Sequence, residues 1–115
     1  MIKLKISELL NSYNFHDSLV DDIQFKDNKV VLKIDLCNWK QKNYKSSEAE
    51  MKNIELIFSN IEDYELDARI DTVDSDTILE FKYDGNSKSV KLVLEDEDDI
   101  KILKFKGENV DIFYK

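Results

Sequence analysis

The chain contains no proline, two glycines, and one residue each of cysteine, histidine and tryptophan. With only Gly85 and Gly107 present, a glycine-rich phosphate-binding loop is excluded. The single cysteine, Cys37, excludes an intrachain disulfide and favours a reducing, cytoplasmic location. The single histidine has no second histidine with which to complete a metal site, and we expect neither a metal nor another cofactor.

Long apolar runs are also missing. None approaches the roughly 20 residues that a membrane helix needs, so we expect no membrane association. Residues 1–6 lack the uninterrupted apolar core of a signal peptide. The length of 115 residues predicts a single domain over residues 1–115, which can bury an ordinary core without a disulfide or metal.

Charge is distributed unevenly along the chain. Residues 1–45 carry eight lysines and six acidic residues, a net charge of +2, whereas residues 46–115 carry nine basic and nineteen acidic residues, a net charge of −10. Such a surface repels phosphate backbones, so we expect no nucleic-acid binding. It attracts a cationic protein partner and speeds the encounter. The alternative is that the acidic surface only keeps a small protein soluble.

Residues 7–13 are predicted to form a short helix. Ser7 is a suitable N-cap, and Glu8 suits the positive end of the helix dipole. At two turns such a helix cannot be stable alone in water, so it must pack on a sheet. Its apolar stripe consists of Ile6, Leu9, Leu10 and Tyr13.

The remainder alternates between apolar and polar residues, as half-buried strands do. Asp27-Asn28 predicts a hairpin turn, and Asp84-Gly85-Asn86 predicts another, with glycine supplying a positive φ. Residues 64–71 give the most regular alternation. We predict an α+β fold, mainly β, in which a short N-terminal helix packs on an antiparallel meander sheet of about eight strands, curved or sandwich-like. The predicted strands lie near residues 19–26, 29–37, 54–58, 64–71, 79–83, 90–94, 102–106 and 110–114.

Residues 38–53 lack any sustained alternation and form the longest irregular stretch. Loops of this length in compact domains are usually functional or disordered. Trp39 and Tyr44 are the candidate partner-binding anchors in this loop, because buried aromatic side chains dominate protein interfaces. Stacking of nucleobases on these rings is disfavoured by the net charge.

Five consecutive acidic residues precede the last two predicted strands. A calcium loop needs spaced oxygen ligands and a glycine at its sharp turn, and this block has neither. We interpret it as a patch that steers a basic partner; its members are Glu95, Asp96, Glu97, Asp98 and Asp99. Among the lysines that follow, Lys101, Lys104 and Lys106 can protect an exposed strand edge.

His16, Asp17 and Ser18 occupy the junction between the predicted helix and the first predicted strand. An imidazole oriented by a carboxylate can act as a base, but neighbouring side chains of an extended chain point apart. We therefore expect a structural role, in which Asp17 and Ser18 bond backbone amides while His16 packs its ring and bonds a carbonyl. The alternative is a ligand-binding or enzymatic domain that uses His16 and Asp17.

The segment Phe15-His16-Asp17-Ser18, followed by a hairpin and then Trp39, resembles the opening of small bacterial proteins of the polymorphic-toxin immunity protein 50 type. The resemblance covers about the first 40 residues. It implies a non-enzymatic cytoplasmic protein that binds and neutralises a cognate toxin, and it supplies no catalytic residues. The acidic charge of residues 46–115 favours a basic toxin domain as the partner. A protein-binding module is therefore the predicted function. The ligand-binding or enzymatic domain and a structural homodimer are the alternatives.

Overall fold

The computed structural model describes residues 2–97 and 99–114. Within these ranges it contains nine strands, one α-helix and two short 3-10 helices. The elements are β1 (Ile2–Lys5), α1 (Ile6–Ser12), β2 (Leu19–Lys26), β3 (Lys29–Cys37), η1 (Asn38–Lys40), β4 (Met51–Phe58), β5 (Glu62–Leu66), η2 (Ile70–Thr72), β6 (Asp76–Asp84), β7 (Ser89–Glu95), β8 (Ile100–Lys106) and β9 (Asn109–Tyr114).

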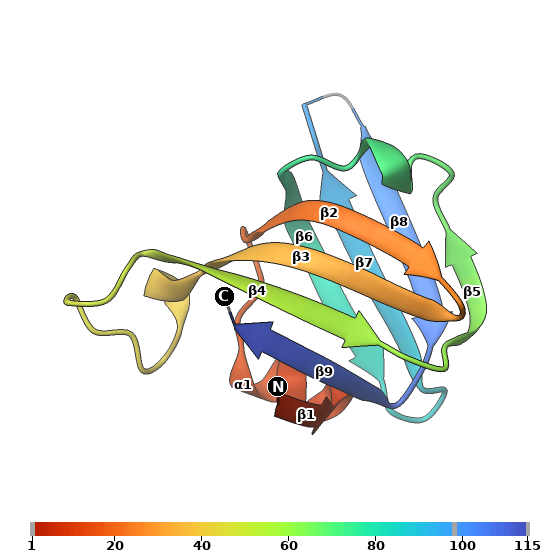
Figure 1. Ribbon diagram of the computed structural model, residues 1–115, viewed down its shortest axis with the longest axis horizontal. Coiled ribbons are helices and arrows are strands. Elements are labelled where there is room, and N and C mark those ends of the chain that lie inside the picture. The colour runs from red at the N-terminus through yellow and green to blue at the C-terminus, as the bar shows by residue number, and fades with distance from the viewer. Residues whose placement is uncertain (1, 98, 115) are drawn as a thin grey trace.

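All the strands belong to one antiparallel sheet, in the order β1-β9-β4-β3-β2-β6-β7-β8-β5. This confirms the predicted α+β, mainly-β class. Two runs of sequential hairpins, β2-β3-β4 and β6-β7-β8, make up most of the meander, and β9 returns to pair with β4. Figure 1 shows β2, β3, β4 and β9 in front, crossing over β6, β7 and β8 behind.

The two halves of the sheet are joined through a narrow contact. β2 pairs with β6 only between Leu19–Val20 and Asp76–Thr77, and both strands have a register shift directly after it. Backbone hydrogen bonds between Asp17–Ser18 and Ile78 lengthen the contact by one step. We call this joint the seam; it comprises residues 17–20 and 76–78.

The core lies between the two halves. Its aromatic centre is Phe58 of β4, whose ring centroid lies 5.1 Å from that of Phe105 on β8 and 6.3 Å from that of Phe81 on β6. Phe15, from the segment after α1, stacks at 5.1 Å on Phe81. These contacts join elements from both halves, so neither half buries its apolar face alone.

The helix begins one residue earlier than predicted, and Ser7 is not its cap. β1, which the sequence analysis did not find, runs directly into α1, so Lys5 takes the cap position. The Lys5 N–H donates to Glu8 Oε1 at 3.1 Å, and the Ile6 N–H donates to the Glu108 carbonyl at 2.9 Å. The pairing of β1 with β9 therefore fixes the start of the helix.

The most regular predicted strand, residues 64–71, is wrong beyond Leu66. The Asp67 carboxylate accepts hydrogen bonds from the backbone N–H and the guanidinium of Arg69, and this closes a turn that leads into η2. β5 itself is largely exposed, and Tyr64 keeps 46% of its surface open to solvent. An alternating pattern in the sequence thus continues through a turn.

Both predicted hairpins form, but by different means. Asp27 and Asn28 have φ angles of 53° and 58°, as a tight two-residue turn requires. In the second hairpin, Gly85 does not have a positive φ, and Lys88 takes that conformation at 57°. The loop between β6 and β7 is therefore longer than the turn centred on glycine that the sequence predicts.

Candidate functional site

The junction between α1 and β2 is a compact turn and not extended chain. Asn14 Oδ1 accepts a hydrogen bond from the His16 N–H at 3.1 Å, and Asp17 has a left-handed φ of 68°. This conformation brings the two side chains together, with His16 Nδ1 at 3.3 Å from Asp17 Oδ2. On the extended backbone that the sequence predicts there, the side chains of His16 and Asp17 would point apart.

The Asp17 carboxylate bonds to side chains, where the sequence analysis expected backbone amides. Lys40 Nζ donates to Asp17 Oδ2 at 2.7 Å. This hydrogen bond holds the pKa of Asp17 below its usual value, and the nearby His16 ring acts in the same direction. Asp17 therefore stays ionised. The His16 ring is exposed beside it, whereas the sequence predicts a packed ring that bonds a carbonyl.

Ser18 is fully buried, and its hydroxyl has a structural role. Its Oγ accepts a hydrogen bond from the backbone N–H of Cys37 at 2.9 Å, which ties the junction to the end of β3. Cys37 is buried as well, and its thiol donates to the Asp17 carbonyl at 3.4 Å. Neither the hydroxyl nor the thiol is therefore placed to act as a nucleophile on a bound substrate.

The His16 imidazole and the Asp17 carboxylate are both exposed, whereas Ser18 is buried. With Asp17 beside Nδ1, the ring is oriented so that Nε2 is left for another partner. In the part of the chain that the structure describes, no three histidine, cysteine or acidic residues come close enough to hold a metal ion.

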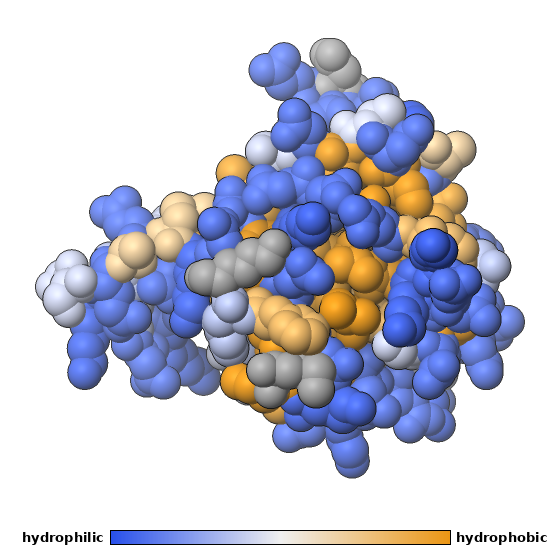
Figure 2. Space-filling view, viewed as in Figure 1, coloured by the Kyte–Doolittle hydropathy of each residue, from blue (hydrophilic) through white to orange (hydrophobic). Residues whose placement is uncertain are grey.

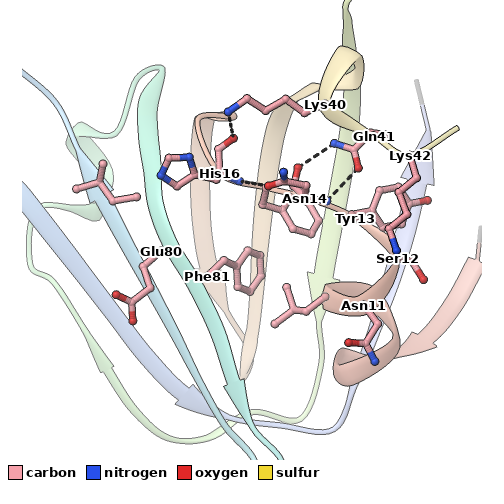
Figure 3. A pocket seen from close by; sticks show the side chains of 13 residues that line it. Asn11, Ser12, Tyr13, Asn14, His16, Lys40, Gln41, Lys42, Glu80 and Phe81 are labelled. Atoms are coloured by element: carbon pink, nitrogen blue, oxygen red, sulfur yellow. Dashed lines mark hydrogen bonds between the residues drawn. The ribbon is translucent and has the colours of Figure 1, made fainter. Parts of the chain in front are cut away.

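A cavity of about 440 Å³ lies next to His16. Its walls are the end of α1, the segment that follows α1, residues 40–42, and residues 79–81 of β6. The Gln41 side chain is fully engaged, bonding the backbone N–H and carbonyl of Asn14 and the Cys37 carbonyl. Figure 3 shows Phe81 directed into this space and Glu80 directed away from it. Asn11, Ser12 and Lys42 also belong to the lining, so the cavity has polar as well as apolar walls.

The loop between β3 and β4 presents a different surface. Residues 41–50 project from the body of the molecule (Figure 1), and this segment is mainly hydrophilic (Figure 2). At its base, Trp39 is 52% exposed and Met51 is 40% exposed. Tyr44, the second predicted anchor, is partly buried, and its hydroxyl donates to the Glu48 carbonyl at 3.3 Å. The structure does not bring Tyr44 and Trp39 into ring contact.

Trp39 is exposed but held in place. Its backbone N–H donates to the Glu50 carbonyl at 3.2 Å, across the two ends of the loop. Lys40 Nζ lies 5.3 Å from the centre of the indole and at the same time bonds Asp17. The backbone of Trp39 is therefore bonded across the loop, and its ring contacts a lysine that is paired with the junction.

Two members of the acidic block are already paired within the fold. Asp96 Oδ2 lies 3.1 Å from Lys101 Nζ, and Asp99 Oδ1 lies 3.1 Å from an Arg69 nitrogen. Glu95 and Glu97 are exposed. Asp98 lies outside the described residues. Only part of the predicted steering patch is thus left for a partner.

Lys101 is buried and does not protect an edge. It is 1% exposed and donates at 2.8 Å to Asp76, which is 2% exposed. The sequence analysis missed this pair, although a signal was present. Lys101 shares its face of β8 with Leu103 and Phe105 in the alternation, and both of these point into the core.

A scan against protein-family models and searches of curated proteins and of solved structures found no match to this chain. The resemblance of the first 40 residues to immunity proteins therefore stays a prediction. None of the helices in residues 2–97 and 99–114 is long and apolar enough to cross a membrane.

Proposed function

We propose that this chain is a non-enzymatic protein-binding module, and specifically an immunity protein that neutralises a cognate toxin in the cytoplasm. One observation carries the proposal: a tryptophan that is 52% exposed stands at the base of a projecting loop. Tryptophan is enriched among the few residues that dominate binding energy at interfaces. A large apolar side chain left in solvent gains most from a partner that covers it.

The contacts around Trp39 also support the proposal. Ordering a flexible side chain on binding costs free energy, and an anchor that is already fixed avoids most of that cost. The hydrogen bond from Trp39 to Glu50 and the tether from Lys40 to Asp17 fix its surroundings before binding. On this proposal the junction helps to position Trp39, because Asp17 binds Lys40 and Lys40 contacts the indole ring.

Charge supports a basic partner. The chain has a formal net charge of −8, and Glu95 and Glu97 remain exposed at the end of β7. Such a field accelerates encounter with a cationic toxin domain and disfavours nucleic acid. A single thiol in the chain suits a reducing compartment.

The test is co-expression with toxin-like genes that neighbour this one, followed by measurement of binding between the purified proteins. We expect the wild-type chain to protect the cell. Trp39→Ala should weaken binding by at least about 30-fold, which corresponds to about 2 kcal/mol. Tyr64→Ala, which removes another exposed aromatic side chain far along the chain on β5, is the matched control and should bind normally.

Two results would contradict the proposal. If the wild-type chain neither binds nor protects against any neighbouring toxin, the immunity role is wrong. If a partner binds Trp39→Ala and Tyr64→Ala equally well, the tryptophan is not the anchor.

The cavity beside His16 supports a second candidate function, the binding of a small ligand. Asp17 Oδ2 lies 3.3 Å from His16 Nδ1, and His16 is one of the residues that line the cavity. A fragment screen followed by ¹H-¹⁵N spectra of the ring tests this candidate. A ligand that shifts the imidazole signals, and that no longer binds His16→Gln, would support it; a screen without such a ligand would reject it.

A further inference from the structure

A solvent-exposed apolar strip lies on the outer face of β7 and β8. These strands and β6 form the rear layer in Figure 1, and their inner face packs on the core. Ile100 and Ile102 of β8 are 52% and 41% exposed. Val93 of β7 is the register partner of Ile102 and is half-buried on the same face. The alternate residues of both strands, such as Leu92 and Leu103, are buried. Val93, Ile100 and Ile102, which we call the outer strip, are therefore separate from the core.

Opposite charges flank the outer strip along β7. Lys91 and Glu95 each lie two residues from Val93, in opposite directions, and the alternation places all three on the outer face. At the usual strand rise, each charged residue is about 7 Å from Val93. Both charged side chains reach solvent. A face with a positive end, an apolar centre and a negative end is complementary to a second copy of itself that is turned end over end.

The positive end also has a reason to attract an acidic group. Lys82, Lys91 and Lys104 are register partners on three neighbouring strands, and like charges directly opposite one another repel. At the end of this row Glu65 of β5 is opposite Lys104, and Glu80 lies 3.6 Å from Lys82 and 3.9 Å from Lys91. A further carboxylate near Lys91 reduces the repulsion within the row.

We propose that two copies of this chain associate through the outer faces of β7 and β8. The copies are related by a two-fold axis that makes the facing strands antiparallel. Val93 and Ile102 then face their own counterparts, and Lys91 of each copy faces Glu95 of the other. Glu80 also faces its counterpart, and its lysine neighbours offset that repulsion. Face-to-face packing with the strand directions within about 30° is the usual way in which two sheets pack.

The size of the face sets the expected affinity. Three strands about 4.8 Å apart, with seven residues in β7 and in β8, give a face of roughly 14 Å by 24 Å. Such an interface lies at the small end of specific interfaces, and the net charge of −8 on each copy opposes association. We therefore expect a weak dimer, with a dissociation constant in the micromolar range at physiological salt.

The dimer goes beyond the proposed function and does not use the tryptophan. The loop that carries Trp39 joins β3 to β4 in the front layer and projects away from β7 and β8 (Figure 1). Trp39→Ala should therefore leave the dimer unchanged. Toxin binding and dimerisation can then fail independently of each other.

Sedimentation equilibrium of the full chain, from low micromolar to millimolar concentration, is the first test. We expect the average mass to rise from that of the monomer towards twice that value. Ile102→Glu places a charge at the centre of the contact and should weaken the dimer more than about tenfold. Ile2→Glu is the matched control, because Ile2 is 44% exposed on β1 at the other end of the sheet order, and it should leave the dimer unchanged. Circular dichroism shows whether each variant is folded.

Charge reversal tests the pairing itself. Lys91→Glu and Glu95→Lys each place like charges together twice in a two-fold dimer, so each should weaken association by about tenfold. The double variant restores both pairs and should associate about as well as the wild-type chain. Net charge alone predicts otherwise, because Glu95→Lys makes the chain less acidic and would then strengthen the dimer.

Three results would overturn the inference. The wild-type chain could remain monomeric up to millimolar concentration. A dimer that Ile102→Glu and Ile2→Glu affect equally would use another face. A double charge variant that associates no better than the single variants would show that Lys91 does not face Glu95 of the other copy.

Discussion

The seam and the loop between β3 and β4 use their residues in opposite ways. Among the described residues, the buried polar and charged side chains are Ser18, Asp76 and Lys101, and all three lie in the seam or bond to it. The loop instead keeps Trp39 and Met51 in solvent. The buried polar groups fix a joint of the sheet, and the exposed apolar groups are the ones that we propose bind a partner.

This contrast has a physical reason. A joint of two residue pairs carries few ladder hydrogen bonds, so the geometry at the seam depends on side chains. A buried polar group without a partner costs about 1–3 kcal/mol. Ser18, Asp76 and Lys101 therefore favour the one arrangement of the seam in which each keeps its hydrogen-bond partner. The loop makes few such contacts, and substitutions there should act on binding and leave stability nearly unchanged.

The largest expected effect is on the buried ion pair. Lys101→Met leaves Asp76 buried beside an apolar side chain, and we expect the free energy of unfolding to fall by about 3–5 kcal/mol. Lys104→Met, at an exposed position of the same strand, should change it by less than about 0.5 kcal/mol. Urea unfolding of both variants measures the difference. Similar losses for the two would show that the pair does not stabilise the seam.

A smaller effect is expected from the backbone at Asp17. Its φ of 68° is left-handed, which glycine adopts freely and alanine does not. Asp17→Gly should therefore melt several degrees above Asp17→Ala, although both lose the exposed contact with Lys40. Thermal unfolding followed by circular dichroism checks this order. An alanine variant at least as stable as the glycine variant would mean that the turn at the junction is not fixed by this conformation.

The smallest effect concerns two acidic residues beside the seam. Partial burial raises the pKa of Asp35, and the neighbouring Asp21 raises it further through a hydrogen bond and repulsion. The folded chain thus binds this proton more tightly than the unfolded chain, so the group destabilises the fold at neutral pH. Asp35→Asn should raise the free energy of unfolding at pH 7 by a few tenths of a kcal/mol.

The effect of Asp35→Asn on the free energy of unfolding should depend on pH. The gain from Asp35→Asn should shrink as the pH falls through the raised pKa of Asp35 and disappear below the ordinary aspartate pKa of 3.8, where the wild-type carboxyl is protonated in both states. Asp71→Asn, at an exposed position, should give no comparable gain. A gain that persists at low pH would point to a cause other than charge.

Much of the fold was predictable from the sequence because apolar and polar residues alternate along half-buried strands. The hairpin of β2 and β3 follows directly from its pattern and from Asp27-Asn28. β1 was missed because four residues next to a helix carry too little pattern. Residues 67–71 were misassigned because Asp67 and Arg69 close a turn within an alternating run.

The site was less predictable, for a related reason. Exposure of Trp39 depends on where the loop leaves the sheet, and this is not encoded in the local pattern. The contact of His16 with Asp17 follows from one left-handed residue, which composition does not reveal. The cavity exists because β2 leaves β6 after two pairs, and strand order between distant segments cannot be derived from alternation.

The most direct test compares Ser18→Ala with Trp39→Ala in the same unfolding experiment. Ser18→Ala leaves the buried Cys37 N–H without its acceptor, so the free energy of unfolding should fall by about 1–3 kcal/mol. Trp39→Ala should change it by no more than about 0.5 kcal/mol. A stable Ser18→Ala together with a strongly destabilised Trp39→Ala would contradict the division between a structural seam and a binding loop.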